Sequence, residues 1–237
     1  MAKKNLPQKH DILNLDYETE PDKVWLTKQE TLRKLVGFLG VSLPPVLYLF
    51  VLGSSGYDKP LDSISHYYYT RWGSLLVIIV SLLAIFLLIY KGKELIDFIL
   101  STVAGTGALL LLLLPTSNIS DPSVPEKVGV THLVDNPVRE AVHYGSAALF
   151  LVSLAIMSIF LFPRVDNTLT KMKKVRNKFY VGFGILMILA LLVIYPGQEI
   201  IPDIVYDKHH LTFWMEALAV EFFGASWLIK GGVFLQD

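Results

Sequence analysis

Five side chains in this sequence have the types and spacing that support catalysis: two serines, two histidines and a glutamate. Ser63, Ser65 and His66 lie in one short stretch, whereas His143 and Glu216 lie far along the chain. Two imidazoles and a carboxylate form a ligand set for one divalent metal such as Zn²⁺, with an open position for water. Without a metal, the same His and Glu side chains can act as acid and base, with either serine orienting the substrate.

Glu140 is a fourth candidate metal ligand because it precedes His143 by three residues, which places both on one helical face. Glu-x-x-His is the spacing of carboxylate-bridged metal sites in helical bundles. A di-iron site needs a second copy and two more carboxylates, and the sequence has neither. The alternative interpretation is a polar cluster that caps helices or bridges water and holds helix ends together.

The composition shows which elements must position these residues. Of 237 residues, 53% are hydrophobic and only 18% are charged, whereas ordinary globular proteins have about 25% charged residues. Several apolar stretches are long enough to cross a bilayer. These features exclude a soluble enzyme, a nucleic-acid module and a disordered chain, and the net charge of 0 gives no sign of a nucleic-acid partner.

The fold class predicted is all-α, a polytopic membrane protein with six spans. Residues 1–34 are expected to form a cytoplasmic tail with a short interfacial helix, begun by a capping box at Thr27 and Glu30. Residues 35–237 are expected to form the membrane domain. The predicted spans are Leu35–Gly53, Gly73–Tyr90, Leu95–Pro115, Ala141–Phe162, Phe179–Tyr195 and Leu211–Ile229.

The distribution of Lys and Arg predicts the orientation. With the N-terminus inside, 16 of these residues lie on the inner side and five on the outer side. The positive-inside rule therefore places both termini in the cytoplasm. Five of the six histidines, and the candidate site with them, then lie on the outer side.

The last predicted span carries two carboxylates at membrane depth, Glu216 and Glu221. A carboxylate at that depth costs several kcal/mol unless it is neutral, paired or facing water, so both are functional candidates. They do not share a helical face, since five residues turn a helix by about 140° beyond one full turn. At the inner side, Asp97 and Lys230 are expected to form a structural ion pair.

Several of these stretches resemble a bacterial family of six-span membrane proteins of unknown function, the DUF998 type, itself distantly similar to the Frag1/DRAM/Sfk1 group. The stretches that carry the resemblance are Ser63-Ile-Ser-His-Tyr-Tyr-Tyr-Thr70, His143-Tyr-Gly-Ser146, Phe213-Trp-Met-Glu216 and Phe223-Gly-Ala-Ser-Trp-Leu-Ile-Lys-Gly231. The resemblance implies a place in the bacterial cytoplasmic membrane and marks Ser63, Ser65, His66, His143, Glu216 and Lys230 as motif positions. It implies no activity, and Glu221 stands where the family has an aromatic residue.

Three functions fit this sequence. The first is a membrane enzyme or lipid-binding protein whose outer site, with or without the metal, hydrolyses, remodels or holds a lipid headgroup. The second is an oligomeric ion channel or small transporter that uses Glu216 and Glu221. The third is a sensor that reports an outer ligand to the cytoplasmic tail or a partner. Membrane lipids and a second copy of the chain are the expected partners.

Overall fold

The structure is a computed structural model, and it describes residues 29–121, 123–164 and 170–236. The described chain is helical, with one isolated β-bridge between Thr70 and Gly129 and no strand. The long helices are α1 (Gln29–Ser55), α2 (Gly73–Ile89), α3 (Leu95–Leu113), α5 (Pro137–Ile156, continued by the π-helix η3, Met157–Leu161), α6 (Lys171–Ile194) and α9 (Leu211–Lys230). The short helices are η2 (Ile64–Tyr69), α4 (Ser123–Lys127), α7 (Gly197–Ile200) and α8 (Asp203–Tyr206).

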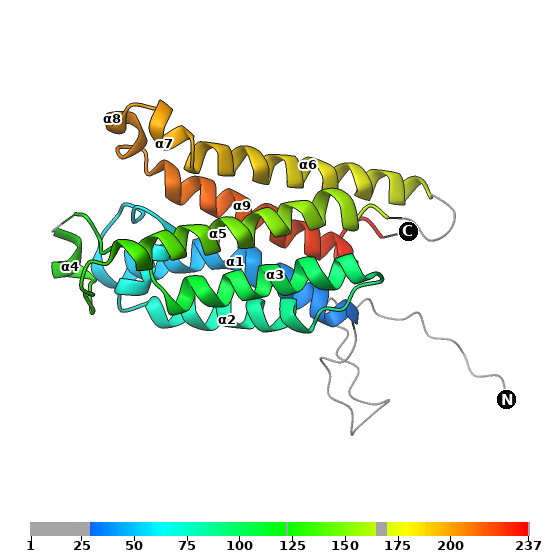
Figure 1. Ribbon diagram of the computed structural model, residues 1–237, viewed down its shortest axis with the longest axis horizontal. Helices are drawn as coiled ribbons and strands as arrows, with labels where there is room; N and C mark the ends of the chain where they lie inside the picture. The colour runs from blue at the N-terminus through cyan, green and yellow to red at the C-terminus, as the bar shows by residue number, and fades with distance from the viewer. Residues whose placement is uncertain (1–28, 122, 165–169, 237) are drawn as a thin grey trace, which may run out of the picture.

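Each long helix overlaps one segment predicted from hydropathy, although α6 begins at Lys171, about two turns before the predicted Phe179. The long helices run side by side along one axis (Figure 1). Each packs on the next long helix of the chain, and α9 packs on both α6 and α1, which closes the arrangement. Helices α1, α3 and α6 run one way, and α2, α5 and α9 run back. Connections between consecutive helices therefore alternate between the two ends of the bundle.

Small residues set the distances between packed helices. A Cβ added to Gly40 of α1 would come within 3.0 Å of the Cα of Gly224 in α9. A Cβ on Gly105 or Gly107 of α3 would meet backbone of α2 or α5 at 2.8 and 2.9 Å. Such close approach is the usual packing of helices in membranes. Gly182 of α6, in contrast, makes no such contact, because a Cβ at this position would have nothing within 4 Å.

The outside of the bundle is apolar. Large side chains such as Leu113 and Phe160 are 74% and 63% exposed, and many others on the long helices are at least one-third exposed. Four helices, α1, α3, α5 with η3, and α6, are long and apolar enough to cross a membrane; α2 is apolar but has 17 residues. This exterior is typical of a membrane-embedded protein.

The predicted tail lies mostly outside the described residues, and with it Thr27 of the capping box. Residues 29–34, which we assigned to that tail, form the first turns of α1 and continue into the predicted first span. Helix α1 is therefore longer at its start than the apolar stretch alone indicates.

The two ends of the bundle differ in their elements (Figure 1). We call one the η2 end, because η2, α4, α7 and α8 gather there. We call the other the Lys230 end, because α9 finishes there beside the start of α1, where Gly231 packs on Lys34. The described chain thus begins and ends at the same side.

Candidate functional site

The candidate site is built around the 3₁₀ helix η2. Ser63 is the N-cap of η2, and its side-chain oxygen accepts a hydrogen bond from the backbone N–H of His66 at 3.3 Å. The same oxygen lies 2.7 Å from Nδ1 of the His66 imidazole. This double contact fixes the His66 ring against the start of its own helix, and the bond to the backbone is the usual role of a serine cap.

Helix α5 contributes His143, whose two ring nitrogens have different partners. Nε2 lies 3.1 Å from Oγ of Ser65, and Nδ1 lies 2.9 Å from the carbonyl oxygen of Leu114 and 3.1 Å from that of Leu111. A carbonyl oxygen only accepts, so Nδ1 carries the proton when the ring is neutral. Nε2 is then a free acceptor for the Ser65 hydroxyl, which is the relation between a general base and a nucleophile.

The acceptors of His143 belong to the C-terminal end of α3, where carbonyls have no partner within the helix. Helix α3 ends just before Pro115, and three side chains take up the carbonyls left there. His143 binds those of Leu111 and Leu114, Arg139 Nε donates to that of Pro115 at 3.0 Å, and the Tyr69 hydroxyl donates to that of Thr116. His143 thus caps the end of one helix and is also the partner of a serine from another element.

Helix α9 contributes Glu216. Its carboxylate accepts a hydrogen bond of 2.7 Å from the backbone N–H of Ile64, the first residue of η2. This N–H has no partner within η2 because it belongs to the first turn. Side chains from α5 and α9 therefore both hold η2 in place, although they are far apart in sequence.

The predicted metal site is not assembled. Among the described residues, no three His, Asp or Glu side chains come together closely enough to hold an ion. The physical reason is that the candidates have other partners: Ser63 for His66, Ser65 and two carbonyls for His143, and Ile64 for Glu216. Glu140 joins no such group either.

His66 is buried and keeps one ring nitrogen without a partner. The residue is 7% exposed, and its Nε2 has no hydrogen-bond partner. Burial lowers the pKa of the His66 imidazole, and the nearby His143 lowers it further, against an opposing effect of Asp62. Burial therefore favours the neutral form of the His66 ring.

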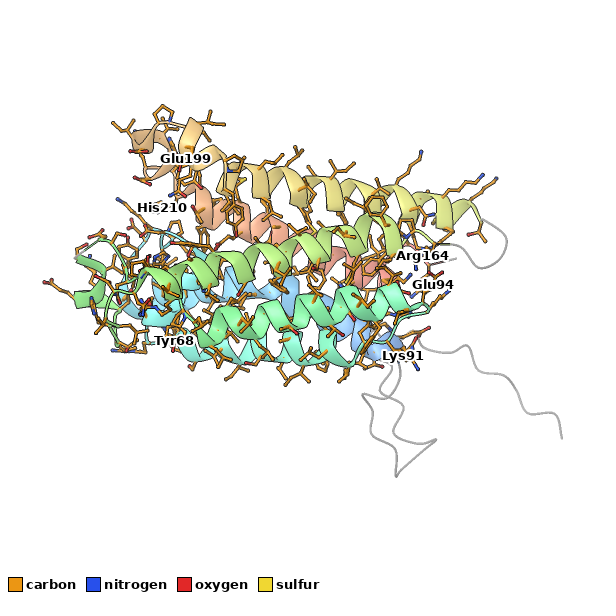
Figure 2. All side chains as sticks on the ribbon, viewed as in Figure 1. Tyr68, Lys91, Glu94, Arg164, Glu199 and His210 are labelled. Carbon is orange, nitrogen blue, oxygen red and sulfur yellow. The ribbon has the colours of Figure 1, made fainter. Side chains whose placement is uncertain are left out.

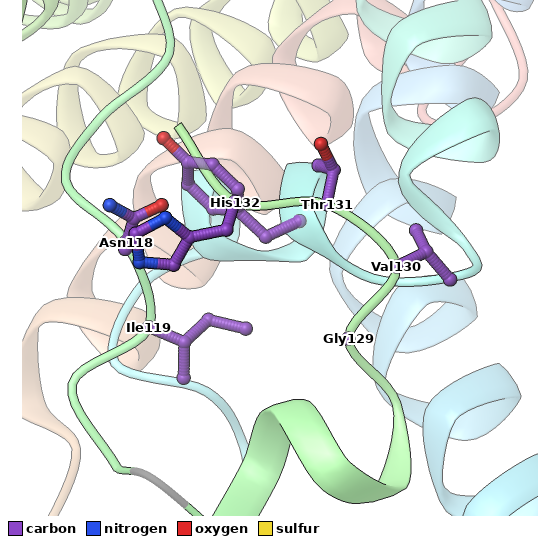
Figure 3. A pocket seen from close by; sticks show the side chains of 7 residues that line it. Asn118, Ile119, Gly129, Val130, Thr131 and His132 are labelled. Carbon is purple, nitrogen blue, oxygen red and sulfur yellow. The ribbon is translucent and has the colours of Figure 1, made fainter. Parts of the chain in front are cut away.

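A cavity of about 310 Å³ lies next to η2 (Figure 3). Tyr69 forms one wall of it, and the other lining residues come from the loops on both sides of α4. They are Asn118, Ile119, Gly129, Val130, Thr131 and His132. Asn118 holds the two loops together, since its amide donates to the carbonyl of Leu133 and to Asp135. No sequence motif marks this cavity, because residues from separate loops form it.

The remaining candidates lie elsewhere. Glu221 is half-buried in the middle of α9, on the helix face that also carries the exposed Trp214 and Leu218. At the Lys230 end, Asp97 pairs with Arg164 at 3.3 Å, and Lys230 donates to the carbonyl of Phe162. The predicted ion pair of Asp97 with Lys230 is thus wrong, because the loop after η3 brings Arg164 to the carboxylate instead.

Arg139 and Tyr69 are residues of this site that sequence reasoning missed. One signal was available, since the Leu-Pro step at the end of α3 implies unpaired carbonyls that need donors.

Comparisons with models of protein families, with curated proteins and with solved structures find no match.

Proposed function

We propose that the chain is a six-span protein of the bacterial cytoplasmic membrane with both termini in the cytoplasm and the η2 end outside. The described chain begins and ends on one side of an antiparallel bundle, which an even number of spans requires. The 20 residues of α9 extend about 30 Å and the 17 of α2 about 25 Å, close to the thickness of the hydrocarbon core. Among the described residues, 11 Lys and Arg lie toward the Lys230 end and five toward the η2 end. As part of this proposal, the chain is related to the DUF998 type that it resembles.

Within that topology, the site favours transfer or hydrolysis at a lipid headgroup, with Ser65 as nucleophile and His143 as general base. The observation that carries this proposal is the position of His143 between the Ser65 hydroxyl and the α3 carbonyls. As Ser65 Oγ attacks an ester, its proton passes to Nε2, and the new O–C or O–P bond replaces the bond to the leaving alcohol. The proton on Nε2 then goes to that alcohol. In the second half, water for hydrolysis or an acceptor alcohol for transfer attacks the group held on Ser65 and gives its proton to Nε2, and Ser65 Oγ leaves and takes that proton back.

The end of α3 has the role that a carboxylate has in a serine hydrolase. The carbonyls of Leu111 and Leu114 fix the tautomer of His143 and face the positive charge that forms on its ring. The C-terminal end of a helix carries about half a negative charge, which stabilises such a cation. This is a weaker orienting group than a carboxylate, but it needs no second buried charge.

The other parts of the site suit a headgroup substrate. Ser65 is partly exposed, whereas His143 is 2% exposed, so the nucleophile is accessible and the base is shielded. The cavity beside Tyr69 offers about 310 Å³ at the depth of the outer headgroups in this topology, and it adjoins the 3₁₀ helix of Ser65, although neither Ser65 nor His143 lines it. Ser63, His66 and Glu216 position η2 and do not touch the reacting atoms in this scheme.

The test uses purified full-length protein in vesicles of phosphatidylethanolamine and phosphatidylglycerol, with headgroup and fatty-acid release measured by mass spectrometry. We expect release that is lost in Ser65→Ala and in His143→Asn. Ser123→Ala is the matched control, since Ser123 is an exposed serine of α4 at the same end and belongs neither to η2 nor to the Ser65–His143 pair. Equal release by the wild type and Ser65→Ala would show that Ser65 is no nucleophile. Headgroup retention without release in both would favour the lipid-binding function.

A further inference from the structure

A small cavity at the Lys230 end is lined by more cations than anions. Arg33, Lys93, Arg164 and Lys230 face it, against the single carboxylate of Asp97. The other lining residues are Tyr90, Met157, Leu161 and Phe162. The space inside is about 20 Å³, which is enough for about one water molecule or one oxygen of a larger group.

The acidic groups near this cavity are already engaged. Asp97 Oδ2 accepts the backbone N–H groups of Lys93 and Glu94, each at 2.9 Å, as part of the capping box of α3. Its Oδ1 lies 3.3 Å from Arg164, which also lies 3.0 Å from Glu94 (Figure 2). The two carboxylates therefore neutralise Arg164 and cap a helix, and neither forms an ion pair with Arg33 or Lys230.

Arg33 and Lys230 have neutral partners among the described residues. Lys230 Nζ donates to the carbonyl of Phe162 at 3.3 Å and lies 5.4 Å from the centre of its ring. Arg33 donates to Gln29 at 3.1 Å and to the Tyr90 hydroxyl, and its Nε is buried with no hydrogen-bond partner. Both charges thus retain capacity to bind an anion.

The cations also repel one another. Arg33, Lys93 and Lys230 line one small space, and Asp97 is the carboxylate among them that opposes their repulsion. Repulsion between partly buried like charges is costly because the surroundings screen it weakly. An anion bound in the cavity would offset this repulsion.

We propose that this cavity binds a phosphate group, with one non-bridging oxygen inside between Arg33 and Lys230 and the rest at the mouth. Arg164 has a side chain 31% exposed and lies at that mouth, where it can reach a second oxygen. Phosphate oxygens match guanidinium and ammonium donors well, and a guanidinium can bind two of them at once. The site is separate from Ser65 and His143 and does not depend on the activity proposed for them.

The surroundings suggest a lipid as the source of the phosphate. The cavity lies at the end of the long helices, where headgroup phosphates of the inner leaflet lie in the proposed topology. Leu95 and Phe98, at the start of α3, are 72% and 42% exposed and offer an apolar surface for an acyl chain. A soluble phosphate ester would use the same cations without this surface.

Binding is measured by native mass spectrometry and by thermal unfolding of the full-length protein in neutral detergent. The probes are phosphatidylglycerol, phosphatidylcholine and inorganic phosphate, each added alone. We expect phosphatidylglycerol to bind and to raise the unfolding temperature, and Lys230→Met and Arg33→Gln each to weaken it about tenfold, the loss of one charge-assisted hydrogen bond. Lys178→Gln is the matched control, since Lys178 is an exposed cation of α6 near the same end.

The results distinguish a lipid from a soluble compound as the source of the phosphate. Binding of phosphatidylglycerol alone identifies a lipid site, and binding of inorganic phosphate of similar strength identifies a site for soluble phosphate compounds. If Lys178→Gln weakens binding as much as the two cavity variants, the attraction is a general surface charge and the proposal is wrong. It is also wrong if no probe binds. If Lys230→Met fails to fold, Arg33→Gln still tests the proposal.

Discussion

The two ends of the bundle both bury polar side chains, but they satisfy them in different ways. At the η2 end, neutral groups such as His143, Tyr69 and Ser63 bind backbone groups that helix ends leave unpaired. At the Lys230 end, Arg164 binds two carboxylates, and Arg33 and Lys230 remain as cations with neutral partners. The first end satisfies most of its polar groups internally and leaves a few, such as His66 Nε2, without a partner, whereas the cavity at the second end is lined by four cations and one carboxylate among the described residues.

This difference bears on what each end can do. A hydrogen-bonded network of neutral groups holds its members in fixed geometry, as a catalytic base requires. An uncompensated set of cations attracts a counter-charge and discriminates poorly beyond charge and shape. We therefore expect chemistry at the η2 end and recruitment of an anion at the Lys230 end.

The greatest loss of stability is expected from changes to His143. His143→Ala leaves the Leu114 carbonyl and the Ser65 hydroxyl without their partner, and we expect it to destabilise the protein by about 2–3 kcal/mol. His143→Asn places an amide N–H near the position of Nδ1, so it should recover much of this stability while losing the base at Nε2. Thermal unfolding in detergent micelles measures both variants. Equal stability of His143→Ala and the wild type would show that the α3 carbonyls do not need His143.

A substitution of Asp97 tests whether the cavity at the Lys230 end is short of negative charge. Asp97→Asn weakens the helix cap of α3 and the contact to Arg164, and we expect a loss of about 1–2 kcal/mol, reduced by the solvent exposure of Arg164. Because the net positive charge of the cavity rises, added phosphatidylglycerol should stabilise Asp97→Asn more than it stabilises the wild type. Thermal unfolding with and without the lipid checks this, and an equal gain in both would contradict the shortage of negative charge.

The pH dependence of stability should come from the η2 end through His66. Its pKa is lowered in the folded protein, so the unfolded chain takes up a proton first as the pH falls. Stability is therefore complete above about pH 6.5, the pKa of a free histidine, and decreases below it. Unfolding measured between about pH 7.5 and 5 should show this decrease in the wild type, and His66→Asn should flatten it. An unchanged slope in His66→Asn would assign the pH dependence to another group.

The six long helices could be predicted from the sequence, because their apolar lengths and flanking charges are local signals. Ser65, His143 and Glu216 could also be singled out, since polar side chains near membrane depth are rare. The groups that bind these three side chains could not be predicted from the sequence. The metal hypothesis treated His143 and Glu216 as ligands of one ion, whereas backbone groups at the ends of α3 and η2 bind them. Backbone partners leave no mark in residue types, so only the three-dimensional arrangement of helix ends shows them.

The wrong prediction for Asp97 has a similar cause. Asp97 and Lys230 both lie where their helices reach the Lys230 end of the bundle, and opposite charges at one level suggest a pair. The structure places Arg164, from the loop after η3, against the carboxylate instead. A loop residue can approach from outside the bundle, and hydropathy gives no information on where it will lie.

The weakest effects are expected from the two carboxylates of α9, which extend the comparison to two faces of a single helix. Glu216→Gln keeps an oxygen that can accept from Ile64 but loses the charge, so we expect a cost of about 1 kcal/mol. Glu221 has no partner among the described residues and shares its face with Trp214 and Leu218, so Glu221→Gln should change stability by less than about 0.5 kcal/mol or increase it.

Proton or cation flux into vesicles that contain the protein is measured on the same variants. A flux that Glu221→Gln abolishes and Glu216→Gln preserves would make the carboxylate on the outer face the functional one and favour the oligomeric channel, because only a second copy of the chain could then enclose that face.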